Sequence, residues 1–159
     1  SKSVVITSAT RTAVGSLGKS LKNIPSEELG SVVIKEAIKR SNIKSSDVDE
    51  TIMGQVLTGG TGQNPARQAA MKSGVPKEKP AYIVNQVCGS GLRSIASGFQ
   101  SIKSGDSKIV IAGGQENMSI AGFILIGISL RKKSQRSSAR SGCRSVMSRN
   151  CQTPIPSAP

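Results

Sequence analysis

The chain has 159 residues, which is enough for one domain with a hydrophobic core. Because aromatic residues make up only 2% of the sequence, we expect the core to consist of Val, Ile, Leu and Ala. Three cysteines are too few for a disulfide framework, and no apolar run approaches the roughly 18 residues of a membrane span. We therefore expect a protein without a membrane segment in a reducing compartment, cytoplasmic or an organellar matrix. The net charge of +13 raises the question of nucleic-acid binding.

Predicted strands and helices alternate along the first part of the sequence. Residues 3–10 (SVVITSAT) are β-branched and predict a buried strand, and residues 25–40 predict a helix with Ser26 as its N-cap. The apolar residues of that helix recur at helical spacing: Leu29, Val32, Val33, Ala37 and Ile38. A strand is predicted at 50–58, followed by a glycine turn and a helix that begins at Asn64 and Pro65 and ends at Gly74.

The second half continues the alternation up to residue 114. Residues 81–87 and 107–114 predict strands, and residues 88–105 predict a helix between them. One face of this helix is apolar, with Leu92, Ile95, Ala96, Phe99 and Ile102. Strands that alternate with helices are joined by crossovers, so we predict an α/β layered fold with at least partly parallel strands.

Residues 120–159 form a differently composed tail. They carry 7 Lys and Arg and no acid, whereas residues 1–119 carry 15 Lys and Arg and all 9 acids. We predict an irregular basic tail, which either binds nucleic acid or acidic partners or has no role. The lack of interleaved aromatic residues disfavours nucleic-acid binding. A further hypothesis is that the tail is an out-of-frame reading of a coding sequence, which resequencing would test.

Cys88 is the candidate reactive residue. It stands where a predicted strand turns into a predicted helix, and unpaired N–H groups at a helix start stabilise an anion such as a thiolate. Gly89 and Gly91 would leave room for a substrate, and the Cys88 N–H could stabilise an oxyanion. The alternative is a buried cysteine that acts as a small apolar residue, beside glycines that permit close packing.

Other motifs point to no site. The segments GGTGQN and GSGLRS lack the residues of a phosphate loop or dinucleotide fingerprint and are interpreted as turns. Cys143 and Cys151 have no histidine partner anywhere in the chain, so we expect no metal site. The absence of histidine also excludes a Cys/His or Ser/His/Asp catalytic arrangement within these 159 residues.

Four ordered segments resemble the thiolase family, specifically biosynthetic acetyl-CoA acetyltransferases. They are VVITSATRTAVGSLGKSL, MGQVLTGGTGQNPARQAAMKSGVP, NQVCGSGLRSIASG and KIVIAGGQENMS. The resemblance implies a layered α/β/α fold with a mixed sheet, of which residues 1–119 would be a partial N-terminal domain. It also implies that Cys88 is the nucleophile, which takes an acetyl group from acetyl-CoA and passes it to a second acetyl-CoA, giving acetoacetyl-CoA and CoA in a reversible reaction.

The same resemblance implies no cofactor, with CoA thioesters as substrates, and a homo-oligomer, either dimer or tetramer.

The family's pattern is lost after Ser119. The Asn-Glu-Ala-Phe motif, the histidine of the His-Pro motif and the second cysteine of the Cys-x-Gly-Gly-Gly motif are all absent, and neither Cys143 nor Cys151 matches that second cysteine. We therefore expect little activity from this chain alone. The alternative is a non-catalytic α/β remnant or interaction protein. Without its second half, the fold is also expected to expose an apolar patch.

Overall fold

The computed structural model describes residues 3–121, which lie within one compact unit, Ser1–Ile124. Its elements follow the order α1 (Ser26–Arg40), a 3-10 turn (Ser45–Asp47), β1 (Glu50–Gly54), α2 (Pro65–Lys72), β2 (Ala81–Val84), α3 (Ser90–Ser104) and β3 (Val110–Gly114). The predicted order of helices and strands from residue 25 onward is confirmed. The three strands are shorter than predicted: β1 and β2 end earlier, where their residues turn into the loop that follows, whereas β3 begins three residues later and ends as predicted.

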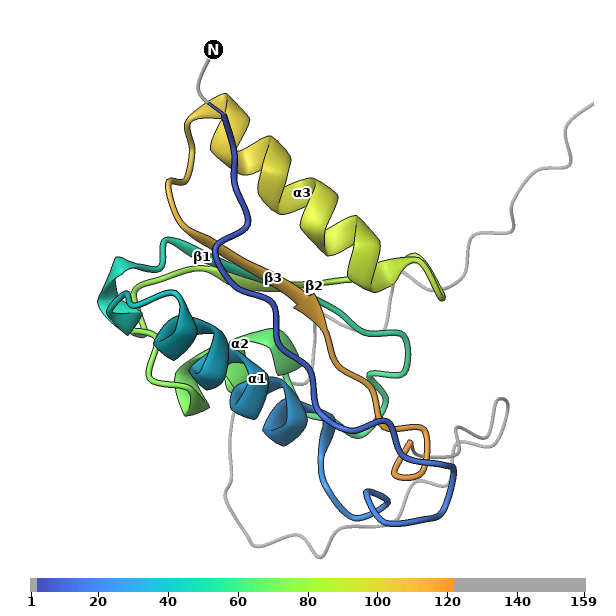
Figure 1. Ribbon diagram of the computed structural model, residues 1–159. Coiled ribbons are helices and arrows are strands. Elements are labelled where there is room, and N and C mark those ends of the chain that lie inside the picture. Colours follow the sequence, from blue (N-terminus) through green and yellow to red (C-terminus); the bar gives the residue numbers. More distant parts are fainter. Residues whose placement is uncertain (1–2, 122–159) are drawn as a thin grey trace, which may run out of the picture. The chain divides into compact units, whose positions relative to one another are not determined.

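The sheet has the order β2-β1-β3, and both pairs of neighbours are parallel. Figure 1 shows α1 and α2 on one face and α3 on the other, which is the predicted α/β layered class. No strand of residues 3–121 runs antiparallel, so the antiparallel member of the expected mixed sheet does not lie in this part of the chain.

The core lies between the sheet and the α1–α2 layer. Its buried residues are Ile34, Val48, Met53, Ala66, Ala69, Ala70 and Val75. On the opposite face, α3 lies close to β3 because it packs with small residues. Ser94 is fully buried, and a Cβ built on Gly98 would lie 3.0 Å from Cγ1 of Val110.

The N-cap of α2 was predicted correctly from the sequence, whereas that of α1 was not. Asn64 is the N-cap of α2, as predicted, and its side chain accepts a hydrogen bond from the Arg67 N–H at 3.2 Å. Ser26 is not the N-cap of α1, which is Pro25. The Ser26 hydroxyl instead accepts a hydrogen bond from Nε2 of Gln55 (3.1 Å), because Ser26 is buried against the sheet as the first helical residue.

The predicted strand at residues 3–10 is not formed. These residues are extended but lie outside the sheet, and Val5 and Ile6 are 71% and 81% exposed. A strand forms only where a second backbone pairs with it, and among residues 3–121 β3 pairs with β1 alone. The prediction therefore failed for lack of a neighbouring strand, even though the residues have high strand propensity.

Side chains from the end of β3 join the loop that follows the N-terminal segment. The Asn117 amide donates to the carbonyl oxygens of Leu21 (3.0 Å) and Ile24 (2.6 Å), and the Gly18 N–H donates to Oγ of Ser119 (2.9 Å). These bonds connect residues more than 90 positions apart and fix the loop at 15–24 beside the C-terminal end of β3.

Candidate active site

Cys88 is an exposed free thiol on the turn between β2 and α3. The helix was predicted to begin at Cys88, but it begins two residues later, at Ser90, with Gly89 as the N-cap. The interpretation of Cys88 as a buried apolar residue is therefore wrong. The thiol lies at the surface, immediately before a helix start.

The turn that presents Cys88 is held by its neighbours. Val87 has a φ of +51°, a left-handed conformation that is unfavourable for a β-branched residue. The Ser90 hydroxyl donates to the Val87 carbonyl (2.6 Å) and accepts from the Gln86 N–H (2.9 Å). The Val87 N–H donates to Oδ1 of Asn85 (3.0 Å). These roles of Asn85 and Ser90 were not predicted from the sequence, although Asn and Ser commonly bond nearby backbone groups in turns.

Two of the N–H groups at the helix start are already engaged. Gly89 donates to the Gln86 carbonyl at 3.0 Å, and Ser90 donates to the Val87 carbonyl at 3.1 Å. The Cys88 N–H is the donor in neither of these two bonds. Its role as an oxyanion donor stays a prediction.

Two glycines decide how much room there is at the start of α3. A Cβ on Gly91 would meet no atom within 4 Å, so the space expected beside this residue is present. A Cβ on Gly54 would lie 2.5 Å from the Ser90 carbonyl carbon and 2.6 Å from the Gly91 nitrogen. Gly54, at the end of β1, therefore allows the start of α3 to lie against the sheet, a requirement that the sequence did not reveal.

The loops after all three strands meet near this turn. The Glu116 carboxylate, after β3, accepts hydrogen bonds from the N–H groups of Val56 (2.8 Å) and Leu57 (3.2 Å), after β1. The Asn85 amide, after β2, donates to the Val56 carbonyl (3.3 Å). Ligands of parallel α/β sheets bind at the carboxyl ends of the strands, and Cys88 follows this same edge.

Buried amides lie beneath these loops. Nε2 of Gln115 donates to Oε1 of Gln55 (3.0 Å), and Nε2 of Gln55 donates to the Ser26 hydroxyl. Both glutamines are at least 93% buried. The three side chains join the ends of β1 and β3 to the start of α1, and so fix the strand ends on which the loops are built.

Cys88 is the one catalytic residue that the sequence predicted, and it lies within residues 3–121. Cys143 and Cys151 lie outside the described residues. Within residues 3–121 no group of three or more His, Cys, Asp or Glu side chains could hold a metal ion. A cavity of about 680 Å³ lies elsewhere, between residues 4–14, α1, α3 and β3, and Cys88 does not line it.

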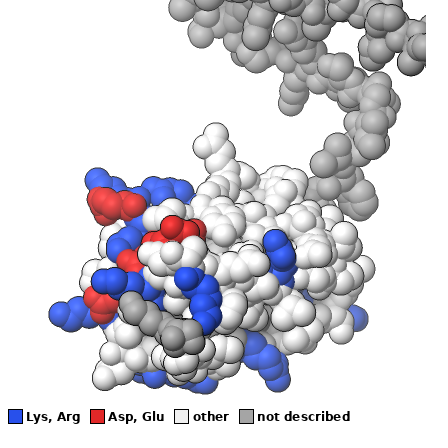
Figure 2. Space-filling view, turned by 90° about the horizontal axis from the view of Figure 1, so that it is seen from above, with Lys and Arg blue, Asp and Glu red and all other residues white. Residues whose placement is uncertain are grey.

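The face of the molecule that Figure 2 shows is not uniformly basic. In Figure 2 acidic and basic side chains are intermingled on one side of the visible face, and much of the remainder carries few charges. The basic tail lies outside the described residues. None of the helices within residues 3–121 has both the length and the apolar composition needed to cross a bilayer.

Comparisons with known proteins agree with the resemblance. Residues 4–150 match the family model described as the thiolase N-terminal domain. The acetyl-CoA acetyltransferases of Cupriavidus necator and Escherichia coli are 58% and 52% identical over 124 residues, which are 78% of this chain and 32% of each relative. The chain thus spans about a third of the length of these curated relatives.

Solved structures give the same result. The acetyl-CoA acetyltransferase of Bacillus anthracis matches with a TM-score of 0.76 and 35% identity, over 84% of this chain and 34% of that one. A thiolase from Ascaris suum in complex with coenzyme A matches with a TM-score of 0.70 and 40% identity, over 76% of this chain and 32% of that one. By sequence and by fold, the chain belongs to the thiolase family, and its match is to the family's N-terminal domain model.

Proposed function

We propose that this chain is the acyl-accepting part of an acetyl-CoA C-acetyltransferase, with Cys88 as the nucleophile. The observation that carries the proposal is the exposed Cys88 thiol on a constrained turn at the carboxyl edge of the parallel sheet, in a chain up to 58% identical to acetyl-CoA acetyltransferases. CoA thioesters would be substrates, and no cofactor is needed for either half of the reaction.

In the first half-reaction, Cys88 sulfur attacks the carbonyl carbon of acetyl-CoA. A new carbon–sulfur bond forms, the bond to CoA sulfur breaks, and the proton given up by the Cys88 thiol passes to the CoA sulfur, so that CoA leaves as a thiol. The negative charge that develops on the carbonyl oxygen needs hydrogen-bond donors nearby, and the Cys88 N–H is the donor that we assign. The open space beside Gly91 allows the thioester to approach the turn.

The second half-reaction needs a general base, and histidine, the side chain that most often serves as one, does not occur in this chain. A methyl proton must be removed from the second acetyl-CoA before its carbon attacks the acetyl group on Cys88, displacing the sulfur. The 159 residues include no histidine, and removal of a general base typically lowers a rate by 10²–10⁴-fold. We therefore expect the isolated chain to accept one acetyl group without continuous turnover.

The test is incubation of the 159-residue chain with acetyl-CoA, followed by peptide mass spectrometry and a CoA-release assay. We expect one acetyl group per chain on the peptide that contains Cys88, and no sustained formation of acetoacetyl-CoA. Cys88→Ser should abolish the labelling as a thioester, whereas the matched control Cys143→Ser/Cys151→Ser should retain it. Acetylation that persists in Cys88→Ala, or continuous turnover, would refute the assignment.

The compartment and assembly are part of the same proposal. A free thiol nucleophile is preserved in a reducing compartment such as the cytoplasm, where we place the protein. The complete enzyme would be a homo-oligomer. Large apolar side chains exposed on α3, among them Leu92 (75% exposed) and Phe99 (48%), support association with further polypeptide.

A further inference from the structure

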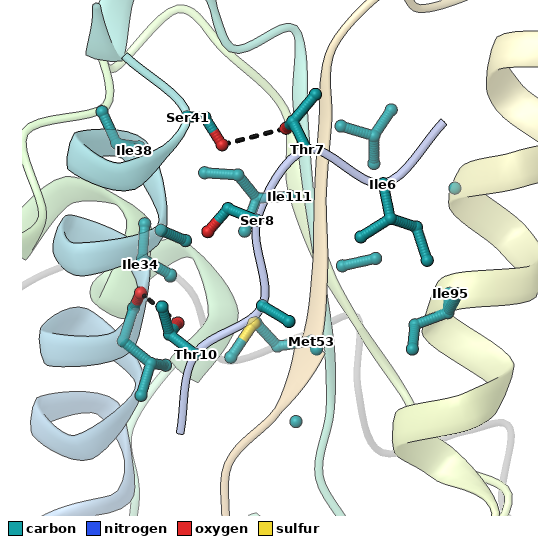
Figure 3. Close-up of a pocket in the computed structure, with 18 of the residues that line it drawn as sticks. Ile6, Thr7, Ser8, Thr10, Ile34, Ile38, Ser41, Met53, Ile95 and Ile111 are labelled. Carbon is teal, nitrogen blue, oxygen red and sulfur yellow. Dashed lines mark hydrogen bonds between the residues drawn. The ribbon is translucent and has the colours of Figure 1, made fainter. Parts of the chain in front are cut away.

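Glu116, two residues after β3, holds the loop that follows β1 through one of its two carboxylate oxygens. Its Oε2 accepts hydrogen bonds from the N–H groups of Val56 (2.8 Å) and Leu57 (3.2 Å). Glu116 also lines the mostly apolar cavity that Figure 3 shows, and its Oε1 is buried without a hydrogen-bond partner in the part of the chain that the structure describes. Burying a carboxylate oxygen without a donor is unfavourable. Stability alone therefore does not explain a glutamate at this position.

A chain of hydrogen bonds connects this carboxylate to the turn before α3. The Leu57 N–H and the Val56 C=O belong to one peptide group, and that carbonyl accepts from the Asn85 side-chain amide at 3.3 Å. The other end of the same amide, Oδ1, accepts from the Val87 N–H at 3.0 Å. In every bond the donor lies on the Val87 side, so the amide dipoles are aligned and each bond polarises the next. The charge of Glu116 at the end strengthens the bond that it accepts.

The chain ends at the residue that sets the direction of the Cys88 N–H. Val87 has a φ of +51°, which its β-branched side chain disfavours. Asn85 holds its N–H, and the Ser90 hydroxyl donates to its carbonyl at 2.6 Å. The Val87 C=O and the Cys88 N–H belong to one planar trans peptide and point in opposite directions. A Val87 carbonyl that is directed toward Ser90 therefore directs the Cys88 N–H to the opposite side.

We propose that Glu116 is a positioning residue for Cys88. Its carboxylate fixes the loop after β1, this loop fixes the Asn85 amide, and Asn85 keeps Val87 in the left-handed conformation. The Cys88 N–H is thereby aimed at the place where the carbonyl oxygen of the thioester becomes negative. The inference rests on the proposed function, in which this N–H is the oxyanion donor. Without Glu116, Val87 would relax toward a negative φ and turn that N–H away.

The test measures acetylation of Cys88 by acetyl-CoA in the 159-residue chain, with Cys143→Ser and Cys151→Ser as background, at several acetyl-CoA concentrations. We expect Glu116→Ala to lower the maximal rate by roughly 10- to 100-fold, since a misplacement of about 1 Å can cost about 100-fold. The half-saturating concentration should stay the same. Iodoacetamide needs the thiolate but develops no oxyanion when it loses iodide, so the rate of its reaction with Cys88 should also stay the same.

Glu116→Gln is the conservative variant. Its amide oxygen can still accept from the loop after β1 but carries no charge, so we expect a smaller loss of rate than with alanine. Far-UV circular dichroism checks that each variant is folded. If the alanine variant is unfolded, the glutamine variant decides, and a glutamine variant with the rate of the unsubstituted chain then refutes the proposal.

Asp49→Ala is the matched control for a purely structural role. Asp49 also accepts two backbone N–H bonds, from Lys108 (2.9 Å) and Ile109 (3.1 Å), but it precedes β1 and lies at the opposite end of that strand. This variant should unfold at a lower urea concentration and yet keep the acetylation rate.

Asn85→Ala tests the path. It should slow acetylation as Glu116→Ala does, and the double variant should be no slower than either single variant, because both substitutions break the same chain of bonds.

Three results would overturn the proposal. They are an unchanged acetylation rate in Glu116→Ala, independent losses that multiply in the double variant, and an equal loss in Asp49→Ala. Amide exchange of Val87, measured by NMR, separates these results from a failure of the proposed function. If Cys88 of the unsubstituted chain accepts no acetyl group, the proposed function fails. Faster exchange of the Val87 N–H in Glu116→Ala would then still support the positioning of the turn, and unchanged exchange would refute it.

Discussion

Replacement of Gly54 by alanine should separate the start of α3 from the sheet. The new Cβ would lie 2.5 Å from the Ser90 carbonyl carbon, whereas ordinary van der Waals contact begins near 3.4 Å. The start of the helix would therefore have to move by about 1 Å. An added methyl group in a packed site typically lowers the free energy of unfolding by 1–3 kcal/mol. Because the obstacle is backbone and cannot rotate away, we expect about 3 kcal/mol for Gly54→Ala.

The assay is urea unfolding of the 159-residue chain, followed by far-UV circular dichroism. With slopes of about 1–3 kcal/mol per molar urea, the midpoint should fall by roughly 1–3 M. Gly91→Ala is the matched control, because its Cβ would meet no atom within 4 Å and alanine favours a helix over glycine by up to about 1 kcal/mol. The reasoning is refuted if the two variants unfold at the same urea concentration.

Two further predictions concern the pH dependence of stability and the strained turn. Hydrogen bonds from the Lys108 and Ile109 N–H groups, and the Lys79 ammonium, hold the pKa of Asp49 below its ordinary 3.8. This stabilisation is present above that pH and lost below it, so Asp49→Asn should flatten the fall in stability on acidification below about pH 4, measured by urea unfolding. Val87→Gly should be more stable than Val87→Ala by about 1 kcal/mol, because only glycine adopts a positive φ without strain; equal midpoints would contradict this.

The sequence predicts elements well where local patterns determine them. Asn64 and Pro65 mark the start of α2, because the Asn64 side chain caps the helix and proline is favoured at the first helical position. The strand predicted at residues 3–10 is not formed, because a strand depends on a backbone neighbour that propensity does not report. Ser26 shows the same limit, since its hydroxyl bonds to Gln55, which is 29 residues away in the sequence.

The candidate site was predicted in part. Cys88 stands out as a lone cysteine between a strand and a run of small residues, and the resemblance assigns its role. The bonds that hold its turn come from Asn85 and Ser90, and the space for the helix start comes from Gly54. Glycine at the end of a strand has many explanations, so its close approach to Ser90 is visible only in three dimensions.

The bonds from Asn117 to the loop at 15–24 also bear on the order of folding. They close loops of more than 90 residues, whereas the crossovers between the three strands close much shorter ones. The entropy lost on closure rises with loop length, and contacts distant in sequence slow folding. The three-stranded sheet with its helices should therefore form first. The loop at 15–24 would join this sheet last, because its partner Asn117 follows β3 in the chain and is synthesised after it.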